Sequence, residues 1–249
     1  MDIIIKTIAS TEEQNKRQVF FDSFQSSPIP NAEKLSNIGL FLKRQDLTKV
    51  LFMNDIYNQI LNVHGVIMEF GVRWGPNLVT LNNLRGIYEP YNYSRKIIGF
   101  DTFSGFLNVD QKDGNHSIIE KGAFSVTENY QVYLNNILSY HESECPLSHI
   151  KKNSTVKGDA SVELEKYLKE HPETIIAFAY FDFDIYEPTK KCLELIKPHL
   201  TKGAIVGFDE LNDPQFPGET VAVKEVLGMN NIRVQRSKFS GIQSYFIVE

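Results

Sequence analysis

The sequence predicts an α/β fold with a doubly wound, mostly parallel, seven-stranded Rossmann-like sheet, a C-terminal antiparallel hairpin and an N-terminal helical appendage. The first observation is that short apolar runs, each as long as a buried strand, alternate with helical stretches after Gly65. Strands that alternate with helices favour a parallel sheet covered on both faces. The second observation is that four of these runs end in Gly or Asp. Polar strand ends are expected in this fold, because it binds ligands at the carboxyl ends of its strands.

Five apolar runs are expected to form the parallel strands, and the stretches that follow them to form helices. The strands are expected at residues 66–70, 96–100, 153–156, 175–181 and 204–208, and the helices at residues 77–84, 127–140, 162–170, 188–197 and 219–226. Ser161 is a suitable N-cap, Pro188 suits the start of a helix and Gly228 suits the end of one. Residues 231–235 and 243–248 flank Ser240-Gly241 and are expected to pair as the antiparallel hairpin.

The segment before Gly65 has a different pattern. Apolar residues recur at roughly helical spacing between residues 35 and 61, with charged and amide side chains between them, which predicts one or two amphipathic helices. Ser26-Ser27-Pro28-Ile29-Pro30-Asn31 predicts a loop. We therefore expect a helical appendage over residues 1–62 and a sheet domain over residues 63–249.

Composition excludes several classes of protein. The chain of 249 residues has 26 Lys and Arg against 31 Asp and Glu, a net charge of −5, which disfavours a general nucleic-acid binder. A membrane span needs about 18 consecutive apolar residues, and the sequence has no such run. The start Met1-Asp2 lacks the basic residue of a signal peptide. Two cysteines exclude a disulfide scaffold. We expect a cytoplasmic protein with neither nucleic acid nor membrane as a partner.

The loops after the first three strands contain candidate nucleoside-binding residues. Two glycines four residues apart follow the first strand and let the backbone approach a ligand at a helix start, although they do not form the Gly-x-Gly-x-x-Gly fingerprint. An acid at the end of the second strand is placed to accept the ribose hydroxyls of a nucleoside. The loop after the third strand is a candidate floor for an adenine pocket. The expected cofactor-binding residues are Glu69, Gly71, Gly75, Asn77, Asp101, Phe103, Gly158, Asp159, Ala160 and Phe183.

Each of these candidates has a structural alternative. The two glycines also suit a tight strand-to-helix turn, and Asp101 also suits a turn or a helix N-cap. For residues 156–161 the alternatives carry equal weight: Asp159 reaches the exocyclic amine of adenine, or the segment is a helix start capped by Ser161.

Acidic residues at the ends of the fourth and fifth strands form the strongest candidate. Asp182 and Asp209 are 27 residues apart, which is the distance from one strand end to the next through one helix. Adjacent parallel strands bring Asp182, Asp209 and Glu210 to one edge of the sheet. Clustered oxygen ligands without Cys or His suit a hard cation such as Mg²⁺. The alternative is that the acids stabilise helix N-termini.

The motifs together resemble the macrocin O-methyltransferase family. The segments that carry the resemblance are Glu69-Phe70-Gly71-Val72, Phe100-Asp101-Thr102-Phe103, Asp182-Phe183-Asp184-Ile185-Tyr186-Glu187-Pro188-Thr189 and Gly207-Phe208-Asp209-Glu210. The resemblance covers residues 65–228. It implies a methyltransferase sheet, S-adenosylmethionine and Mg²⁺ as cofactors, sugar hydroxyls of natural products as acceptors, and metal ligands at Asp182, Asp209 and Glu210. Glu210 stands where many members have Asp, and Arg73-Trp74-Gly75 departs from the usual small, glycine-rich loop.

We therefore expect an S-adenosylmethionine- and Mg²⁺-dependent O-methyltransferase that acts on a sugar hydroxyl of a glycosylated natural product or glycan. Residues 63–249 are then the methyltransferase domain, and the protein is expected to be a homo-oligomer. Asp182 and Glu210 are the expected catalytic residues, with Asp182 taking the proton of the acceptor hydroxyl.

Two other functions remain as alternatives. A nucleotide-sugar or NAD-dependent enzyme on a similar sheet is disfavoured by the missing Gly-x-Gly-x-x-Gly and by the lack of a Tyr-x-x-x-Lys pair at a plausible position. A non-catalytic binding protein with the methyltransferase fold is the other.

Overall fold

The structure is a computed structural model that describes residues 9–249. The chain divides into two compact units, one that ends at Thr48 and one over Lys49–Glu249. The domain boundary between residues 62 and 63 stays a prediction. Among residues 9–249, no helix is long and apolar enough to cross a membrane.

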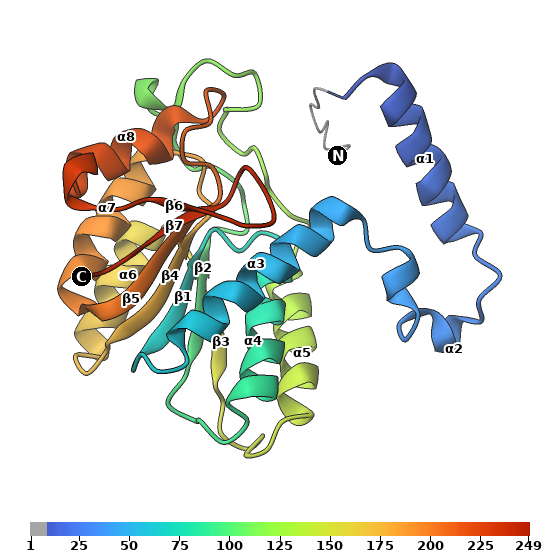
Figure 1. The fold of residues 1–249 in the computed structure, drawn as a ribbon, viewed down its shortest axis with the longest axis horizontal. Helices are drawn as coiled ribbons and strands as arrows, with labels where there is room; N and C mark the ends of the chain where they lie inside the picture. Colours follow the sequence, from blue (N-terminus) through green and yellow to red (C-terminus); the bar gives the residue numbers. More distant parts are fainter. Residues whose placement is uncertain (1–8) are drawn as a thin grey trace. The chain divides into compact units, whose positions relative to one another are not determined.

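The second unit is built around one seven-stranded sheet with the strand order β3-β2-β1-β4-β5-β7-β6 (Figure 1). The five strands β1 to β5 are parallel, and β7 is antiparallel to both β5 and β6. The predicted fold class is therefore confirmed, including the C-terminal hairpin. The strands are β1 Val66–Phe70, β2 Ile97–Asp101, β3 Asn153–Lys157, β4 Ile176–Phe181, β5 Leu200–Phe208, β6 Gln235–Arg236 and β7 Ser244–Ile247.

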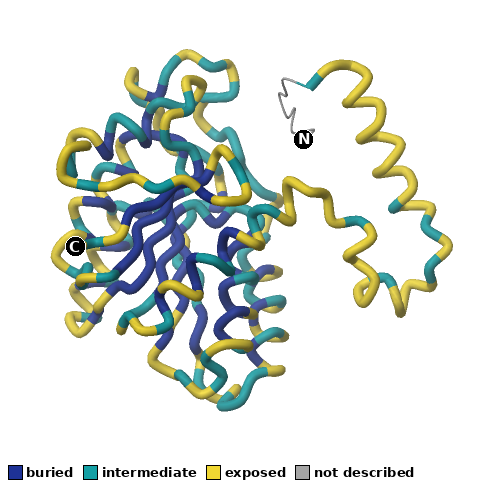
Figure 2. Tube along the Cα trace, viewed as in Figure 1, coloured by how far each residue is buried: buried dark blue, intermediate teal, exposed yellow. Residues whose placement is uncertain are grey.

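Helices cover both faces of the sheet because successive strand side chains point to opposite sides. Ile67 packs into one core with helices α3, α4 and α5, whereas Met68 and Phe70 pack into a second core with α6, α7 and α8. Figure 2 shows the buried strands between the two helix layers. The helices are α3 Arg44–Ile60, α4 Pro76–Tyr88, α5 Tyr130–Ser143, α6 Ala160–Glu170, α7 Tyr186–Ile196 and α8 Pro217–Val226, with short 3₁₀ turns at η1 Ile38–Leu40, η2 Gln111–Asp113, η3 Lys197–His199 and η4 Met229–Asn231.

The predicted amphipathic segment is largely confirmed by α3. Its buried residues recur at helical spacing and lie in the first of the two cores: Phe52, Met53, Ile56, Tyr57 and Ile60. Polar and charged residues lie between them, so the helix can face the core on one side and solvent on the other.

The first unit contains a helix that the sequence analysis does not predict, α1 Thr11–Gln25, followed by the short α2 Asn31–Lys34. Ser10 and Glu13 form a capping box at its start, with the Ser10 side chain on the Glu13 amide and the Glu13 carboxylate on the Ser10 amide. This Ser-x-x-Glu pattern is a readable start signal. Its apolar side chains lack regular helical spacing, which explains why periodicity did not identify the helix.

Two local predictions need correction. The N-cap of α6 is Asp159, not Ser161, because the Asp159 carboxylate accepts the Ser161 amide at 2.9 Å. The first hairpin strand is only two residues long and starts at Gln235, because η4 occupies the start of the predicted run. The predicted helix stop at Gly228 is confirmed: this glycine directly follows the cap of α8 with φ of 71°.

Candidate active site

A cavity of about 610 Å³ lies at the carboxyl ends of the parallel strands. This is where a doubly wound sheet binds its ligands. Most of the predicted site residues line it: Gly71, Asn77, Asp101, Gly158, Asp159, Ala160, Asp182, Phe183, Asp209 and Glu210. Glu69, Gly75 and Phe103 do not line the cavity; Gly75 and Phe103 directly adjoin lining residues, and Glu69 lies two residues before Gly71.

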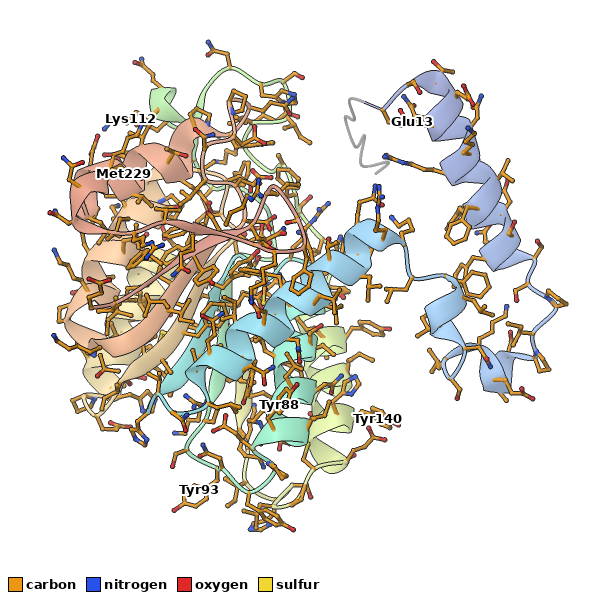
Figure 3. The ribbon with its side chains drawn as sticks, viewed as in Figure 1. Glu13, Tyr88, Tyr93, Lys112, Tyr140 and Met229 are labelled. Atoms are coloured by element: carbon orange, nitrogen blue, oxygen red, sulfur yellow. The ribbon has the colours of Figure 1, made fainter. Side chains whose placement is uncertain are left out.

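The opposite end of the sheet, at the amino ends of the parallel strands, has different exposed side chains. Three exposed tyrosines, Tyr88, Tyr93 and Tyr140, lie there, where α4 and α5 end (Figure 3). The predicted acids and glycines are all at the cavity end, so the two ends of the sheet are chemically distinct.

The turn after β1 requires glycine at two positions. Gly71 has φ of 91°, and a Cβ atom there would lie 2.0 Å from the carbonyl oxygen of Asp182. Gly75 has φ of 78° and forms the N-cap of α4, where a Cβ atom would lie 2.6 Å from the Leu134 side chain. Gly71 therefore lets the ends of β1 and β4 approach each other, Gly75 lets the start of α4 pack against α5, and both lie in a tight strand-to-helix turn.

Asp101, the last residue of β2, has a fixed orientation. Its Oδ2 accepts the amide of Arg73 at 2.8 Å, and its Oδ1 accepts the amide of Phe103 at 2.5 Å. Both neighbours have left-handed backbone conformations, with φ of 47° and 53°. Two backbone amides thus hold the carboxylate at the cavity wall, while each oxygen keeps a further lone pair for a ligand.

Asp209, which follows β5, accepts hydrogen bonds at both carboxylate oxygens. Its Oδ1 accepts the Tyr180 hydroxyl at 2.7 Å and the Gln243 amide at 2.6 Å. Its Oδ2 pairs with Lys49 Nζ at 3.1 Å. Lys49 comes from α3 and Gln243 from the loop before β7, and the sequence analysis names neither residue.

The acids around Asp209 are buried and crowd one another. Burial, followed by the charge of Asp209, raises the pKa of Asp182 well above its ordinary value and that of Asp184 to about 6. Burial, followed by the charge of Asp184, raises the pKa of Glu210 to about 10. Glu210 Oε2 is buried without a hydrogen-bond partner among the described residues. The cluster therefore contains more carboxyl groups than the neighbouring Lys49 can pair with, and burial and crowding favour their protonated forms.

Two further buried glutamates lie next to this cluster. Both carboxylate oxygens of Glu69 are buried, and burial followed by the charge of Asp182 raises its pKa against the opposing effect of the Asn77 side chain. Glu219 accepts the amide of Phe183 at 3.1 Å, and burial followed by the charge of Asp184 raises its pKa. The sequence analysis missed Glu219 and the role of Asp184 in the cluster. The run Asp182-Phe183-Asp184 was a signal for Asp184, whereas Glu219 lies on α8 without a motif.

Comparison with solved structures gives similarity over the full length of the chain to the methyltransferase CalS11. The chain is 43% identical to CalS11, a calicheamicin methyltransferase, with a TM-score of 0.94, 99% of this chain and 96% of that chain being covered. The apo structure of CalS11, described as a TDP-rhamnose 3'-O-methyltransferase, matches at 42% identity, 99% coverage of both chains and a TM-score of 0.85. This chain belongs to the CalS11 family of methyltransferases.

More distant comparisons add information about the fold. The O-methyltransferase NovP is 16% identical over 81% of this chain and 80% of that chain, with a TM-score of 0.58, which shows a shared fold. No protein-family model matches the chain, and no curated protein sequence does.

Membership of the CalS11 family confirms the predicted enzyme class, an S-adenosylmethionine-dependent O-methyltransferase. It favours this class over the two alternatives, a nucleotide-sugar or NAD-dependent enzyme and a non-catalytic binding protein with the methyltransferase fold. The roles of individual residues in this CalS11-family enzyme stay predictions. Within residues 9–249, no three His, Cys, Asp or Glu side chains are grouped in a way that could hold a metal ion.

The acid cluster predicts how the stability of this CalS11-family enzyme depends on pH. The pKa of Glu210 is raised from 4.5 to about 10, so the folded chain holds this proton more tightly than the unfolded chain does. Its contribution to the free energy of unfolding is therefore full below pH 4.5 and is lost as pH rises toward 10. In buffer free of divalent cations, we expect Glu210→Gln to lose less stability than wild type between pH 6 and pH 9.

Thermal unfolding at several pH values measures this difference. Glu120→Gln, which removes an exposed carboxylate, is the matched control and should follow wild type. Parallel pH profiles for wild type and Glu210→Gln would show that Glu210 does not hold a proton in this range.

Proposed function

We propose that the enzyme methylates a hydroxyl group of a sugar, in a glycosylated natural product, a glycan or the nucleoside-diphosphate sugar from which one is made. The observation that supports this most directly is the full-length similarity to CalS11, whose acceptor is TDP-rhamnose. The cavity at the strand ends, with Asp101 at one side and the acid cluster at the other, is consistent with two ligands bound side by side. The narrower resemblance to macrocin O-methyltransferases stays a prediction.

The cofactor is placed at the loops after β1, β2 and β3. S-adenosylmethionine, when bound, supplies a methyl group on a sulfonium centre. Asp101 accepts the two ribose hydroxyls with the lone pairs that the backbone amides leave free. Asp159, which caps α6 and also lines the cavity, is the predicted contact of the adenine amine. Gly71, which lines the cavity without a side chain, is the predicted neighbour of the methionine part.

The acceptor hydroxyl is placed between the cofactor and the acid cluster. Asp182 would take the proton of this hydroxyl as its oxygen became the nucleophile for the methyl group, which would leave the sulfur of the cofactor. When ionised, Asp182 is a stronger base than an ordinary carboxylate because its pKa is raised. Glu210 lies in the same cluster and is the second candidate for this role. Holding the two reacting atoms together in line contributes about 7–11 kcal/mol to lowering the barrier in well-oriented reactions.

We also propose that Asp182, Asp209 and Glu210 hold a divalent cation such as Mg²⁺. The donor chemistry fits, because the buried Oε2 of Glu210 lacks a partner and the pKa values of Asp182 and Glu210 are raised by neighbouring carboxylates as well as by burial. The fit is weaker at Asp209, whose Oδ2 already pairs with Lys49. When bound, such a cation lowers the pKa of a hydroxyl group that it contacts.

The direct test is methyl transfer from isotopically labelled S-adenosylmethionine to a panel of acceptors. The panel should contain thymidine-diphosphate deoxysugars, free sugars and glycosylated natural products, each tested with Mg²⁺ and with excess chelator. Transfer to a sugar hydroxyl supports the proposal. Transfer only to acceptors without a sugar would contradict it, and undiminished transfer in chelator would contradict the role of the metal.

Asp101→Ala should weaken cofactor binding. The variant removes a charged acceptor from two ribose hydroxyls, and hydrogen bonds to a charged group contribute about 1.5–3 kcal/mol each. We expect the Kd of S-adenosylhomocysteine to rise at least tenfold, measured by calorimetry on protein shown to be folded. Unchanged affinity would remove Asp101 from the cofactor site.

We propose that the predicted homo-oligomer forms through the first unit. None of the described residues up to Thr48 is buried, although eight large apolar side chains there are between 38% and 83% exposed: Val19, Phe20, Phe21, Leu35, Ile38, Leu40, Leu42 and Leu47. At about 150–250 Å² for a large side chain, these expose on the order of 700 Å². That is close to the roughly 800 Å² that each partner of a standard interface buries.

A second copy of this chain is the partner that fits this surface. Residues 9–48 contain five acidic and five basic side chains, so two copies of the unit do not repel each other by net charge. We expect Leu35→Glu and Leu40→Glu to lower the oligomer mass measured by light scattering, whereas Val162→Glu on α6 should not. An unchanged mass in both variants, or a monomeric wild type, would contradict this interface. The cytoplasmic location stays a prediction.

A further inference from the structure

Arg73 is the cationic side chain of the cavity wall that has no acidic partner among residues 9–249. Within the described residues, the cavity is lined by the basic side chains of Lys49, Arg73 and Lys191. Lys49 pairs with Asp209 at 3.1 Å, and Lys191 pairs with Glu187 at 4.0 Å. Over residues 9–249, no carboxylate lies within 4.0 Å of the Arg73 guanidinium, and its Nε is buried without a hydrogen-bond partner. A buried guanidinium N–H without an acceptor is costly, so a ligand acceptor is expected there.

Two segments hold Arg73 in place, the end of β2 through its main chain and the loop between β2 and α5 through its side chain. The Arg73 amide donates to Asp101 at 2.8 Å, which holds the residue at the strained φ of 47°. Its guanidinium lies 4.9 Å from the ring centroid of Phe124, a cation–π contact with the long loop between β2 and α5. Arg73 is therefore held in place beside the cavity and does not extend freely into solvent.

The surroundings favour an anionic ligand group at this point. The rest of the wall is rich in acids, and the positive charge of Arg73 acts on Asp182 and Asp184 only from a distance, by lowering their pKa values against the stronger effect of burial. An incoming anion is therefore attracted at Arg73 and not at the acid cluster. The planar guanidinium matches the paired oxygens of a carboxylate or phosphate.

We propose that Arg73 binds an oxyanion of a ligand in this cavity. The inference rests on the proposed function, which supplies two such groups: the methionine carboxylate of the cofactor and the diphosphate of a nucleoside-diphosphate sugar. Both are recognised by the same chemistry. In either case Arg73, at a position where the loop departs from the usual small residues, selects for ligands that have the anionic group.

Two pairs of probes distinguish the sources. S-adenosylhomocysteine and 5'-deoxy-5'-methylthioadenosine share the nucleoside, and only the first has the carboxylate. Thymidine diphosphate and thymidine differ in the same way by the diphosphate. Binding of all four is measured by calorimetry on wild type, Arg73→Met, Arg73→Lys and the control Arg233→Met, which removes an exposed arginine outside the cavity lining.

We expect Arg73→Met to weaken the anionic member of one pair by roughly 10- to 100-fold, since hydrogen bonds between charged groups are the strong ones, and to leave its neutral member unchanged. Arg73→Lys should restore part of the loss because it keeps the charge without the paired geometry. Control variant Arg233→Met should bind like wild type.

The outcomes separate this inference from the proposed function. If wild type binds the anionic probes and both Arg73 variants bind them equally well, or if both members of a pair weaken together, the inference is wrong and the proposed function stands. If wild type binds neither S-adenosylhomocysteine nor 5'-deoxy-5'-methylthioadenosine, the proposed function fails, and this inference fails with it.

Discussion

Replacing Asp182 with Asn is expected to reduce turnover by on the order of 10²- to 10⁴-fold, the usual contribution of a general base. Asn can still offer an oxygen to a cation but cannot accept the proton of the acceptor hydroxyl at any cation concentration. The position of Asp182 is consistent with the role of general base: it lines the cavity and lies directly after β4, and its carbonyl oxygen packs against Gly71. Turnover should be measured against Mg²⁺ concentration with both substrates saturating.

The response to Mg²⁺ separates the two roles of Asp182. A variant that only weakens metal binding regains activity when Mg²⁺ is raised, whereas a missing base is not replaced. Asp182→Glu is the matched variant, because it keeps an acidic group at a shifted position and should retain more activity than Asn. If Asp182→Asn recovers to near the wild-type rate, Asp182 holds the metal alone and the base must be sought at Glu210.

Replacing Asp209 with Asn is expected to abolish Mg²⁺-dependent turnover while leaving cofactor affinity nearly unchanged. The Asp209 carboxylate accepts from three donors, the Tyr180 hydroxyl, the Gln243 amide and the Lys49 ammonium. The neutral amide keeps the shape but removes the charge that pairs with Lys49, and it presents N–H groups toward some of these donors. A buried donor left without an acceptor costs about 1–3 kcal/mol, so the melting temperature should fall as well.

Turnover, cofactor affinity by calorimetry and thermal unfolding should be measured together for this variant. Gln243→Leu is the matched control: it removes one donor from Asp209, keeps the charge, and should lower stability with a smaller loss of turnover. Wild-type turnover in Asp209→Asn would exclude Asp209 from the reaction. Lost cofactor affinity in a folded variant would place it on the cofactor side of the cavity.

Local patterns in the sequence were sufficient for the parallel sheet. The run at residues 66–70 matches β1, and the runs that end near Asp101 and Asp182 match β2 and β4 closely. The run at residues 204–208 matches the end of β5, which starts four residues earlier, at Leu200. The length and apolar content of a strand depend only on residues that are adjacent in the sequence, so both can be predicted directly from the sequence. The same holds for the acids at the strand ends, because parallel strands separated by one helix must end at the same edge of the sheet.

The partners of those acids could not be read in this way. Lys49 lies 160 residues before Asp209, and Gln243 lies 34 residues after it. Nothing local to either residue indicates that α3 and the C-terminal hairpin reach the same carboxylate. Likewise, whether Asp159 or Ser161 caps α6 depends on the direction of one carboxylate oxygen, and the structure shows Asp159 Oδ1 on the Ser161 amide.

The sequence by itself thus determined the layered sheet, the edge at which ligands bind and the acids gathered there, since each follows from periodicity and from the direction of parallel strands. The tertiary structure decided the charge balance of the site. It shows Asp209 paired with Lys49, Glu210 with an unpartnered buried oxygen, and Arg73 without an acidic partner among the described residues. Those properties depend on which side chains from distant segments meet in a buried space, and packing of the whole chain fixes that.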